Sequence, residues 1–363
     1  MYDVVIVGGG PAGSMAALIL SRAGKKVLVL EKSHFPRAKV CGNSLNPRNW
    51  SLWQRHGLAE RFNRLPHFKI RGFTLERGGS PVLRHSFRHE GARTVERGTL
   101  DAWLAEEAHR AGATFLFGVT AHGLTDSHLQ TTAGEIEAPL VIGADGRNSV
   151  VGRLSRLARA SVACGRIGWQ TFVDLPALDD HVHMNVFPEG YYGLNRISST
   201  QNTITLVLFA ASKVTPEQIL QRYLPQASST TWKSMHPITR KPWEVTNARS
   251  WLIGDAARVL EPLTGEGVFS ALVSAEMAAN HLLSIERVGV RVAAARYRSQ
   301  HRAFYRMRTL LNSAVGWALA DSKRSMRIMQ SLEYWPTAAS PLVEWVQGAA
   351  PRPIREEISI STP

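Results

Sequence analysis

The chain has 363 residues, 44% of them hydrophobic, and this length and composition suit one large or two modest globular domains with a full core. Its formal net charge of +14 favours contact with polyanions, such as anionic lipid or acidic and carrier-bound substrates, but no recognised nucleic-acid-binding fold accompanies the charge. The chain has only two cysteines, which excludes a disulfide scaffold. The sequence shows neither a signal-peptide pattern nor an apolar run near the roughly 18 residues of a membrane span. We therefore expect a cytoplasmic protein, and because no nucleic-acid-binding fold is recognised, one that does not bind nucleic acid.

The first 31 residues have the pattern of a dinucleotide-binding unit. An apolar strand over residues 2–7 leads into a glycine-rich turn, and an alanine- and leucine-rich helix follows. The turn consists of Gly8, Gly9, Gly10, Pro11, Ala12 and Gly13. A second apolar strand, 27–30, is followed at once by Glu31, eighteen residues after Gly13, which is close to the roughly 20-residue spacing of this fold.

Each part of this pattern has a physical task. Gly8 lets the chain turn tightly, Gly10 lacks a Cβ and lets the backbone approach a pyrophosphate, and Gly13 lets the helix lie close to the strand. The unpaired amides at the start of the helix face the anion. Glu31 can accept hydrogen bonds from both hydroxyls of an adenosine ribose and would repel a phosphate there, so the pattern predicts FAD or NAD rather than NADP.

Two β-sheet insertions are expected within this unit. Residues 68–87 predict one or two β-hairpins around a turn at 78–81. From about residue 165 to 245 the sequence changes to short alternating strands, and a helix at 216–223 interrupts them. The expected strands cover residues 169–173, 181–187, 191–197 and 203–209.

Nucleotide-type sequence surrounds the insertions. A helix from Arg97 to about residue 111 precedes a strand at 114–117, and a further apolar strand at 140–144 leads into Asp145 and Gly146. We therefore expect an α/β protein with a Rossmann-like nucleotide-binding domain, an inserted antiparallel-sheet substrate domain and C-terminal helices. The expected boundaries are 1–66, 90–160 and 246–290 for the nucleotide-binding domain, 67–89 and 161–245 for the substrate domain, and 291–363 for a basic helical region with a loose tail.

The C-terminal region is strongly basic. Residues 291–331 carry nine Lys or Arg against one acid, Asp321, and apolar and aromatic residues lie between them, as in basic amphipathic helices. Such a surface could lie on an anionic membrane, which would make the protein peripheral to the inner membrane. It could equally pack its apolar stripe on the main domain and leave the arginines in water. The sequence leaves both interpretations open, and it does not indicate an oligomeric state.

Four segments, in order along the chain, match one known pattern. They are the turn 8–13 with Glu31, the sequence FPRAKVCG at 35–42, the sequence GADG at 143–146, and the segment 254–267 with its Gly-Asp-Ala-Ala, Pro262 and Gly-Glu-Gly. In these segments the chain resembles the FAD-dependent oxidoreductases of the para-hydroxybenzoate hydroxylase type, and within them the geranylgeranyl reductase family. The resemblance covers residues 1 to about 285 and implies FAD as cofactor.

The resemblance also implies which residues contact FAD. Asp255 would accept hydrogen bonds from the ribityl hydroxyls, and residues 265–267 would open a helix whose amides face the pyrimidine edge of the flavin. The full set expected at the cofactor is Gly8, Gly10, Pro11, Ala12, Gly13, Glu31, Lys32, Arg37, Arg97, Asp145, Gly146, Gly254, Asp255, Gly265, Glu266, Gly267 and Val268.

Three residues are expected at the reacting side of the flavin. Pro262 and Gly265 would lie near its ring, and the thiol of Cys41 could donate a proton or shape the pocket. The alternative for Cys41 is a buried and inert cysteine.

The substrate sheet departs from the archaeal geranylgeranyl reductases. They carry a Y-x-W-x-F-P motif, and the aligned stretch here, residues 183–188, keeps only Phe-Pro. The candidate substrate contacts are the aromatic and amide side chains of Phe187, Tyr191, Tyr192 and Asn195. The W-x-W-x-I-P motif of flavin-dependent halogenases is absent, which argues against halogenation.

Two further kinds of site are not expected. Asp179, Asp180, His181 and His183 lie close together, but no third histidine or cysteine stands at ligand spacing, so we expect no metal. There is no second G-x-G-x-x-G for a nicotinamide cofactor. NAD(P)H would therefore dock transiently, or a partner reductase would deliver the electrons.

These observations predict an FAD-dependent oxidoreductase that acts on a hydrophobic substrate, such as an isoprenoid, a polyketide or a lipid-like precursor. In the first hypothesis a hydride passes between flavin N5 and a C=C bond of the substrate, and Cys41 supplies the proton. In the alternative, the enzyme is a monooxygenase that hydroxylates or epoxidises an aromatic or polyketide/terpenoid substrate through a flavin hydroperoxide. A third hypothesis, a non-catalytic nucleotide-binding or membrane-surface protein, predicts that the flavin-binding residues are missing, whereas the chain retains them.

Overall fold

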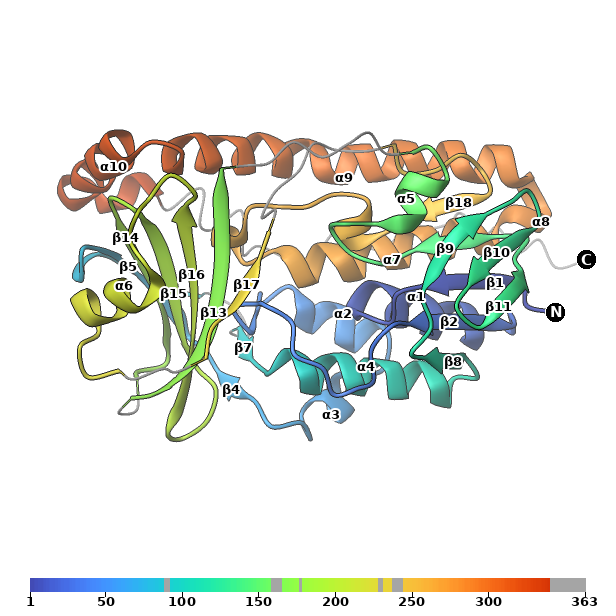
Figure 1. The fold of residues 1–363 in the computed structure, drawn as a ribbon, viewed down its shortest axis with the longest axis horizontal. Helices are drawn as coiled ribbons and strands as arrows, with labels where there is room; N and C mark the ends of the chain where they lie inside the picture. The colour runs from blue at the N-terminus through green and yellow to red at the C-terminus, as the bar shows by residue number, and fades with distance from the viewer. Residues whose placement is uncertain (88–91, 158–164, 176–177, 228–230, 237–243, 340–363) are drawn as a thin grey trace, which may run out of the picture.

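The computed structural model describes residues 1–87, 92–157, 165–175, 178–227, 231–236 and 244–339. It has two neighbouring parts, one built on a parallel sheet and one on a larger sheet, and the long helix α9 (Val290–Leu319) runs along both of them (Figure 1). The loose tail that the sequence predicts lies outside the described residues.

In the described residues, the nucleotide-binding part contains a five-stranded parallel sheet in the order β18-β12-β1-β2-β8. Its strands are β1 (Val4–Val7), β2 (Val27–Glu31), β8 (Thr114–Phe117), β12 (Val141–Gly143) and β18 (Ser250–Leu252). Every residue of β1 and β2 is buried, as expected for central strands that are covered on both faces. The α/β fold class with a Rossmann-like domain is therefore confirmed.

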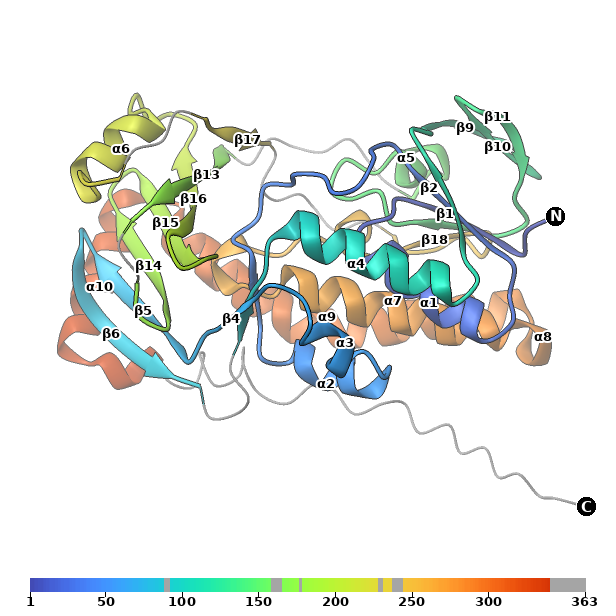
Figure 2. The same ribbon diagram turned by 90° about the horizontal axis from the view of Figure 1, so that it is seen from below.

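Helices cover this sheet. The helix α1 (Pro11–Arg22) packs against both α4 (Arg97–Arg110) and α7 (Gly267–Leu283), and Figure 2 shows these helices side by side below the sheet. The shorter elements of this part are β3 (Ser44–Leu45), α2 (Asn49–Arg55), α3 (Ala59–Phe62), β4 (Phe68–Lys69), β7 (Arg93–Thr94), β9 (Ala121–Leu124), β10 (His128–Thr131), β11 (Gly134–Glu137), α5 (Val150–Leu154), η1 (Gly254–Ala256), η2 (Pro262–Thr264) and α8 (Ile285–Val288).

The described residues of the second part form a seven-stranded sheet in the order β17-β13-β16-β15-β14-β5-β6. Its strands are β5 (Gly72–Arg77), β6 (Ser80–Ser86), β13 (Arg166–Asp174), β14 (His181–Phe187), β15 (Gly190–Arg196), β16 (Gln201–Phe209) and β17 (Lys233–Met235). The sheet was expected to be antiparallel, but β14 and β5 pair in parallel. The reason is that the β5–β6 hairpin comes from the first insertion and joins the edge strand of the second.

The two faces of the seven-stranded sheet have different partners. On the outer face, α6 (Pro216–Tyr223) covers a cluster that includes Leu194, Leu206 and Ile219. On the inner face, the end of α9 and the helix α10 (Ser322–Tyr334) pack against Val186 and Val207. A last short helix, η3 (Pro336–Ala339), follows α10.

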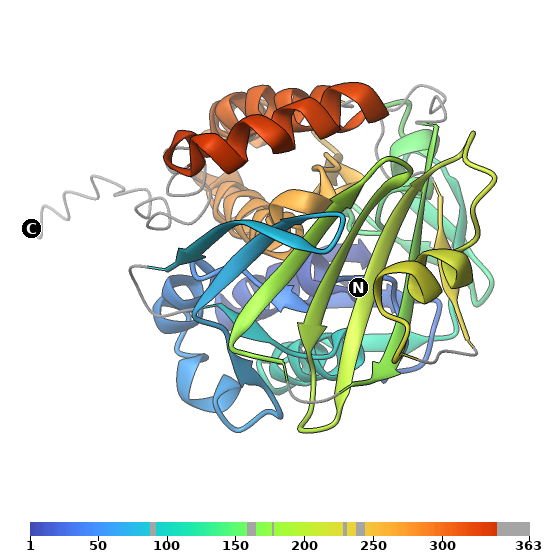
Figure 3. The ribbon, with the colours of Figure 1, turned by 90° about the vertical axis from the view of Figure 1, so that its left-hand side faces the viewer.

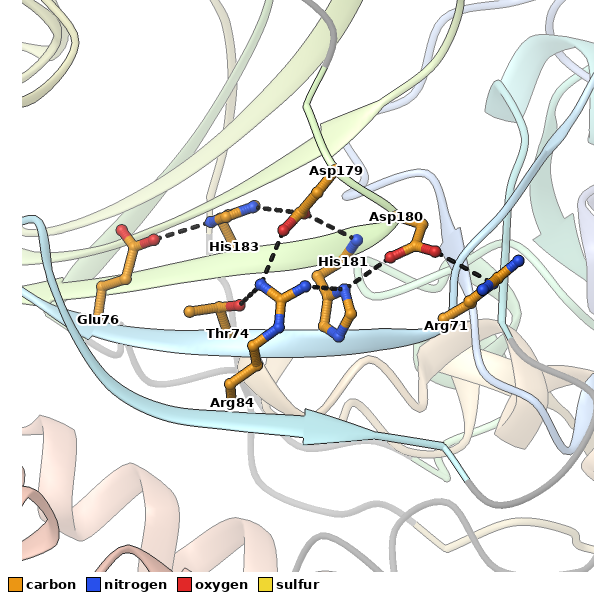
Figure 4. A network of polar contacts seen from close by, with 8 residues as sticks. All are labelled: Arg71, Thr74, Glu76, Arg84, Asp179, Asp180, His181 and His183. Carbon is orange, nitrogen blue, oxygen red and sulfur yellow. Dashed lines mark hydrogen bonds and ion pairs between the residues drawn. The ribbon is translucent and has the colours of Figure 1, made fainter.

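The outer face of β5, β6 and β14 carries a polar network rather than an apolar core (Figure 4). His183 lies between two carboxylates, 2.8 Å from Glu76 and 2.9 Å from Asp179. Arg84 donates to Asp179 at 2.8 Å and also contacts His181. The histidines and carboxylates that raised the question of a metal are thus paired with one another and with arginine, and the described residues contain no cluster suited to a metal ion.

This network should make stability depend on pH. The hydrogen bond with Glu76 raises the pKa of His183 against the effect of burial, and the bond with Asp179 adds to this. A raised pKa stabilises the fold below the unfolded-state pKa near 6.5, and this contribution disappears as the pH rises through the folded-state pKa. We expect His183→Gln to lower the free energy of unfolding by up to about 1 kcal/mol at about pH 6 and by less at about pH 8.5, as measured by urea unfolding. An equal loss at both values would contradict this assignment.

Candidate functional site

The glycine turn between β1 and α1 leaves one side open to a ligand. A Cβ on Gly8, whose φ is +103°, would lie 2.5 Å from the carbonyl oxygen of Ala144, and a Cβ on Gly13 would lie 1.9 Å from that of Gly8. A Cβ on Gly10 would meet only the guanidinium tip of Arg37, at 3.6 Å. Gly8 and Gly13 are therefore required by the fold, whereas Gly10 faces space where the backbone can approach an anion.

Glu31 lies directly behind this turn. It is buried, and its carboxylate accepts hydrogen bonds from the amides of Gly9 (2.9 Å) and Ser33 (3.0 Å). Arg37 lies 3.4 Å from Glu31 and 3.3 Å from Asp101, so its charge is held next to Gly10. Lys32, which we also expected at the cofactor, is exposed, and it does not line the cavity described next.

A cavity of about 420 Å³ extends from this turn to the inner face of the seven-stranded sheet. It brings together most of the residues that the sequence predicted, from segments far apart in the chain. Those that line it are Gly10, Pro11, Ala12, Cys41, Arg97, Gly146, Tyr191, Asn195, Gly254, Asp255, Pro262, Gly265, Gly267 and Val268.

The far part of the cavity is built from η1, η2 and the start of α7. Gly265 has a φ of +63°, a left-handed conformation that ends η2, and α7 then begins at Gly267 with its free amides beside the cavity. The carboxylate of Asp255 lies 3.3 Å from Arg147 and also lines the cavity. A helix start and a carboxylate at this place suit a polar ring edge and a neutral chain of hydroxyl groups.

Arg97 and Cys41 lie together on the cavity wall. Arg97 forms two hydrogen bonds of 2.9 Å with Asp101, and the Cys41 side chain is a further partner of its guanidinium. Burial lowers the pKa of the Arg97 guanidinium, but the neighbouring Asp101 and Cys41 raise it by more, so that the pKa lies above its usual value. Cys41 is a free, half-buried thiol. Cys41 is therefore not fully buried, and its reactivity stays a prediction.

Two carboxylates that were expected at the cofactor point elsewhere. Asp145 accepts hydrogen bonds from the Ser149 hydroxyl (2.5 Å) and from the amides of Val150 (2.6 Å) and Val151 (3.0 Å), so it caps the start of α5. Burial raises the pKa of Asp145, and these bonds oppose the rise.

Glu266 is fully buried and lies 3.3 Å from Arg308 and 3.5 Å from Arg48. Neither Glu266 nor Asp145 lines the cavity. The neighbouring glycines, Gly146, Gly265 and Gly267, line the cavity instead.

Two of the predicted substrate contacts are wrong. Phe187 and Tyr192 belong to the outer cluster under α6, where both rings lie against Tyr223. The physical reason is the alternation of side chains along a strand, which sends Tyr191 and Asn195 into the cavity and Tyr192 to the opposite face. Burial raises the pKa of Tyr192 to about 12, so its hydroxyl stays protonated in this cluster.

One buried residue of the site went unpredicted. Glu261, directly before Pro262, accepts hydrogen bonds from the Tyr191 hydroxyl (2.8 Å) and from both terminal nitrogens of Arg166 (3.1 and 2.8 Å). Its backbone amide donates to the side chain of Asn312 on α9 at 2.5 Å. Glu261 thus joins β13, β15 and α9 at the turn that carries Pro262. Its position beside Pro262 is the one sequence signal that could have singled it out.

Lys39, which is half-buried, also belongs to the site. It lines the main cavity and also a second cavity of about 390 Å³, which Arg97 and Lys233 line as well. Burial, followed by the charge of Arg97, lowers the pKa of Lys39. The segment with Cys41 therefore separates two cavities, and both have cationic side chains in their walls.

Comparison with known proteins identifies the family. Residues 1–183 match the family described as FAD binding domain. The chain belongs to this family of FAD-dependent oxidoreductases. The open side at Gly10, the carboxylate of Asp255 and the helix start at Gly267 on one cavity fit FAD along its length.

Relatives and solved structures extend this assignment. The menaquinone reductase of Mycobacterium tuberculosis strain H37Rv is 30% identical over 77% of this chain and 76% of its own length. The geranylgeranyl diphosphate reductase of Rhodobacter capsulatus is 28% identical over 84% of this chain and 82% of its own. A geranylgeranyl bacteriochlorophyll reductase-like protein from Thermoplasma acidophilum shares the fold, with a TM-score of 0.79 at 21% identity over 92% of this chain and 91% of that one. The chain is thus a member of the geranylgeranyl reductase and para-hydroxybenzoate hydroxylase-like flavoproteins.

Proposed function

We propose that the protein reduces a C=C bond of a hydrophobic substrate, in the manner of a geranylgeranyl reductase. The observation that carries this proposal is the composition of the cavity beyond the flavin segments, which is almost entirely apolar. The apolar side chains come from the inner face of the sheet and from the C-terminal helices: Phe73, Leu75, Leu83, Phe87, Val182, Met184, Val207, Leu263, Val315 and Leu332. A wall of this kind suits a long hydrocarbon substrate that lies across the sheet.

The chain supplies binding groups and a proton, and FAD, when bound, supplies the two-electron redox chemistry. The amides at the start of α7 and the carboxylate of Asp255, which line the cavity together with Pro262, would hold the cofactor. Reduction of a C=C bond adds a hydride to one carbon and a proton to the other. The thiol of Cys41 would supply the proton, and Arg97, which contacts the sulfur, would stabilise the thiolate left behind. Electrons come from NAD(P)H or from a partner reductase.

Two polar atoms near Cys41 would orient the substrate. The Oδ1 atom of Asn195 and the hydroxyl of Thr205 are buried and make no hydrogen bond within the described residues. Both side chains lie beside Gly42, and the Asn195 Nδ2 donates to its carbonyl at 2.6 Å. A buried polar atom without a partner costs roughly 1–3 kcal/mol, which a hydroxyl or carbonyl group of the substrate would recover. The proposed substrate therefore has one polar group near Cys41 and an apolar chain that extends toward α10.

The named relatives support reduction as the reaction. Menaquinone reductases and a geranylgeranyl diphosphate reductase are among them, and this chain covers about three quarters or more of each. PqsL from Pseudomonas aeruginosa, described as a probable FAD-dependent monooxygenase, has a TM-score of 0.73 at 18% identity, and this likeness concerns the fold alone.

The test is an anaerobic turnover assay with FAD-loaded protein, dithionite as reductant, and menaquinone or a geranylgeranyl compound as substrate. After the quinone ring has been reoxidised, we expect the isoprenoid chain of the product to carry two additional hydrogen atoms at one former C=C bond. We expect Cys41→Ala to lower kcat by about a hundredfold or more, the usual contribution of a positioned acid, at unchanged FAD content. Asn195→Leu should raise KM more than it lowers kcat. No turnover without oxygen, together with labelled O₂ incorporated into the product in a parallel aerobic assay, would show monooxygenation and overturn the proposal.

A further inference from the structure

The outer sides of α9 and α10 expose large apolar side chains. On α9 these are Met307, Leu310 and Trp317, whose exposed fractions are 48%, 60% and 61%. At the end of α10 they are Tyr334 and Trp335, at 73% and 69%. Isolated exposed apolar residues are ordinary, but Met307, Leu310 and Trp317 follow one another at three and seven residues and so share one face of α9, with Tyr334 and Trp335 at the end of the neighbouring helix. Apolar side chains grouped in this way are typical of an interaction site.

The inner sides of the same helices already hold the fold together. Tyr297 and Tyr305 of α9 are buried against the α7 side, and Leu319 and Met329 pack on the inner face of the sheet. Figures 1 and 3 show α9 and α10 together as the outermost layer on one side of the molecule. The exposed apolar side chains are therefore not required for packing within the chain.

Basic side chains accompany the exposed apolar ones. Arg302 and Arg306 on α9, and Lys323 and Arg327 on α10, are exposed and form no ion pair in the described part of the chain. Arg324 lies over the ring of Trp317, 4.0 Å from its centroid, which places a further charge on the same surface. We call these basic residues, together with Met307, Leu310, Trp317, Tyr334 and Trp335, the outer helix face.

The outer helix face is the other side of the cavity wall. Val315 of α9 and Leu332 of α10 line the apolar part of the cavity from within. Two helices thus separate the proposed hydrocarbon site from a surface of aromatic rings and cations. Because the same two helices line the cavity and carry the exposed surface, an apolar substrate could reach the cavity from whatever binds that surface.

We propose that the outer helix face binds the surface of an anionic lipid bilayer. Arginine and lysine attract acidic headgroups, tryptophan and tyrosine rings lie at headgroup depth, and Leu310 and Met307 reach the acyl boundary. The net charge of +14 also attracts the protein to an anionic surface. No helix of the described residues is long and apolar enough to cross a bilayer, so the contact is with the surface. Membrane binding of this kind does not depend on the proposed reaction.

Vesicle co-sedimentation tests the proposal. FAD-loaded full-length protein is mixed with vesicles of phosphatidylcholine alone, or of phosphatidylcholine and phosphatidylglycerol in roughly equal parts. We expect binding to the anionic vesicles only, weaker at high salt. Arg302→Glu with Arg306→Glu should weaken it by roughly thirtyfold or more, about fivefold for each arginine removed. Leu310→Ser with Trp317→Ser should remove the binding that persists at high salt.

The matched control reverses the charge of two basic residues on another surface of the protein. Arg64 and Lys69 are exposed and lie next to α3 and in β4, on the side of the molecule away from α9 in Figure 1. Arg64→Glu with Lys69→Glu should leave binding within about twofold of wild type, apart from the general loss of net charge. Unchanged melting temperature and FAD content verify that all variants fold.

Three results would overturn the proposal. One is equal weakening by the two charge-reversal pairs, which would show that net charge alone drives binding. Another is absence of binding to anionic vesicles. The third is a dimer in solution that Leu310→Ser with Trp317→Ser converts to a monomer while vesicle binding stays unchanged, which would show that a second copy of the chain covers the outer helix face.

Discussion

Adding one methyl group at Gly13 should destabilise the folded protein, whereas the same methyl group at Gly10 should weaken FAD binding. The Cβ of Gly13→Ala would lie 1.9 Å from the carbonyl oxygen of Gly8, so α1 must move away from the sheet. Overpacking of this kind costs about 1–3 kcal/mol of unfolding free energy. The Cβ of Gly10→Ala meets only the guanidinium of Arg37 at 3.6 Å, an ordinary van der Waals contact, so the fold tolerates it.

The effect of Gly10→Ala is expected on the affinity for FAD. The new methyl group occupies the side on which a pyrophosphate approaches, and each hydrogen bond to a charged group is worth about 1.5–3 kcal/mol. We expect FAD to bind at least about tenfold more weakly for every amide hydrogen bond that the methyl group prevents. Thermal melting of the apoprotein and titration with FAD separate the two effects. A Gly10→Ala protein that binds FAD as wild type does would contradict this placement of the pyrophosphate.

Replacing Glu261 with glutamine should lower the free energy of unfolding by about 3–5 kcal/mol, the range measured when a buried ion pair loses one partner. Glu261 is 4% exposed, and its substitution removes the carboxylate that pairs with Arg166, which is 9% exposed. Burial and the charge of Glu261 raise the pKa of Tyr191, which keeps that hydroxyl a donor. The substitution therefore also loosens the cavity wall at Tyr191.

Urea unfolding of the apoprotein measures this effect. The control is Glu286→Gln, which removes a carboxylate that pairs with Lys25 on the surface, where its side chain is 80% exposed. We expect less than about 1 kcal/mol from the control. Similar losses from both substitutions would show that the bonds of Glu261 do not hold the two parts of the molecule together.

The cofactor half of the site could be predicted because its signals are local. The turn between β1 and α1 and the acid at the end of β2 lie within the first 31 residues, and the glycines of the turn form a pattern that the sequence shows directly. The substrate half was only partly predictable. Tyr191 and Asn195 lie four residues apart and so share a face of a strand, which already excluded Tyr192. That alternation was visible in the sequence, but the prediction followed the aromatic composition instead.

Other features depend on contacts that no sequence window contains. Glu261 meets Arg166 from 95 residues away, and Glu266 meets Arg48 from 218 residues away. From the sequence, Glu266 was expected to bind the cofactor because it lies in a flavin motif. In the structure it pairs with Arg48 and Arg308 instead. The basic C-terminal region had two open interpretations for the same reason. The structure shows that part of this region packs inward, with Arg308 buried, while another part remains exposed.

The order of the strands has a consequence for how the protein is made. The parallel sheet takes β18 from residues 250–252, and α1 packs on α7, which ends at Leu283. A Cβ on Gly254 would lie 3.0 Å from the Cβ of Ala12, so the first and last segments of the nucleotide-binding part meet closely. During synthesis the ribosome releases the glycine turn early, but the cradle for FAD closes only after roughly four fifths of the chain has emerged. FAD therefore binds late in synthesis. Until β18 has been made, the edge of β12 in the parallel sheet has no partner strand.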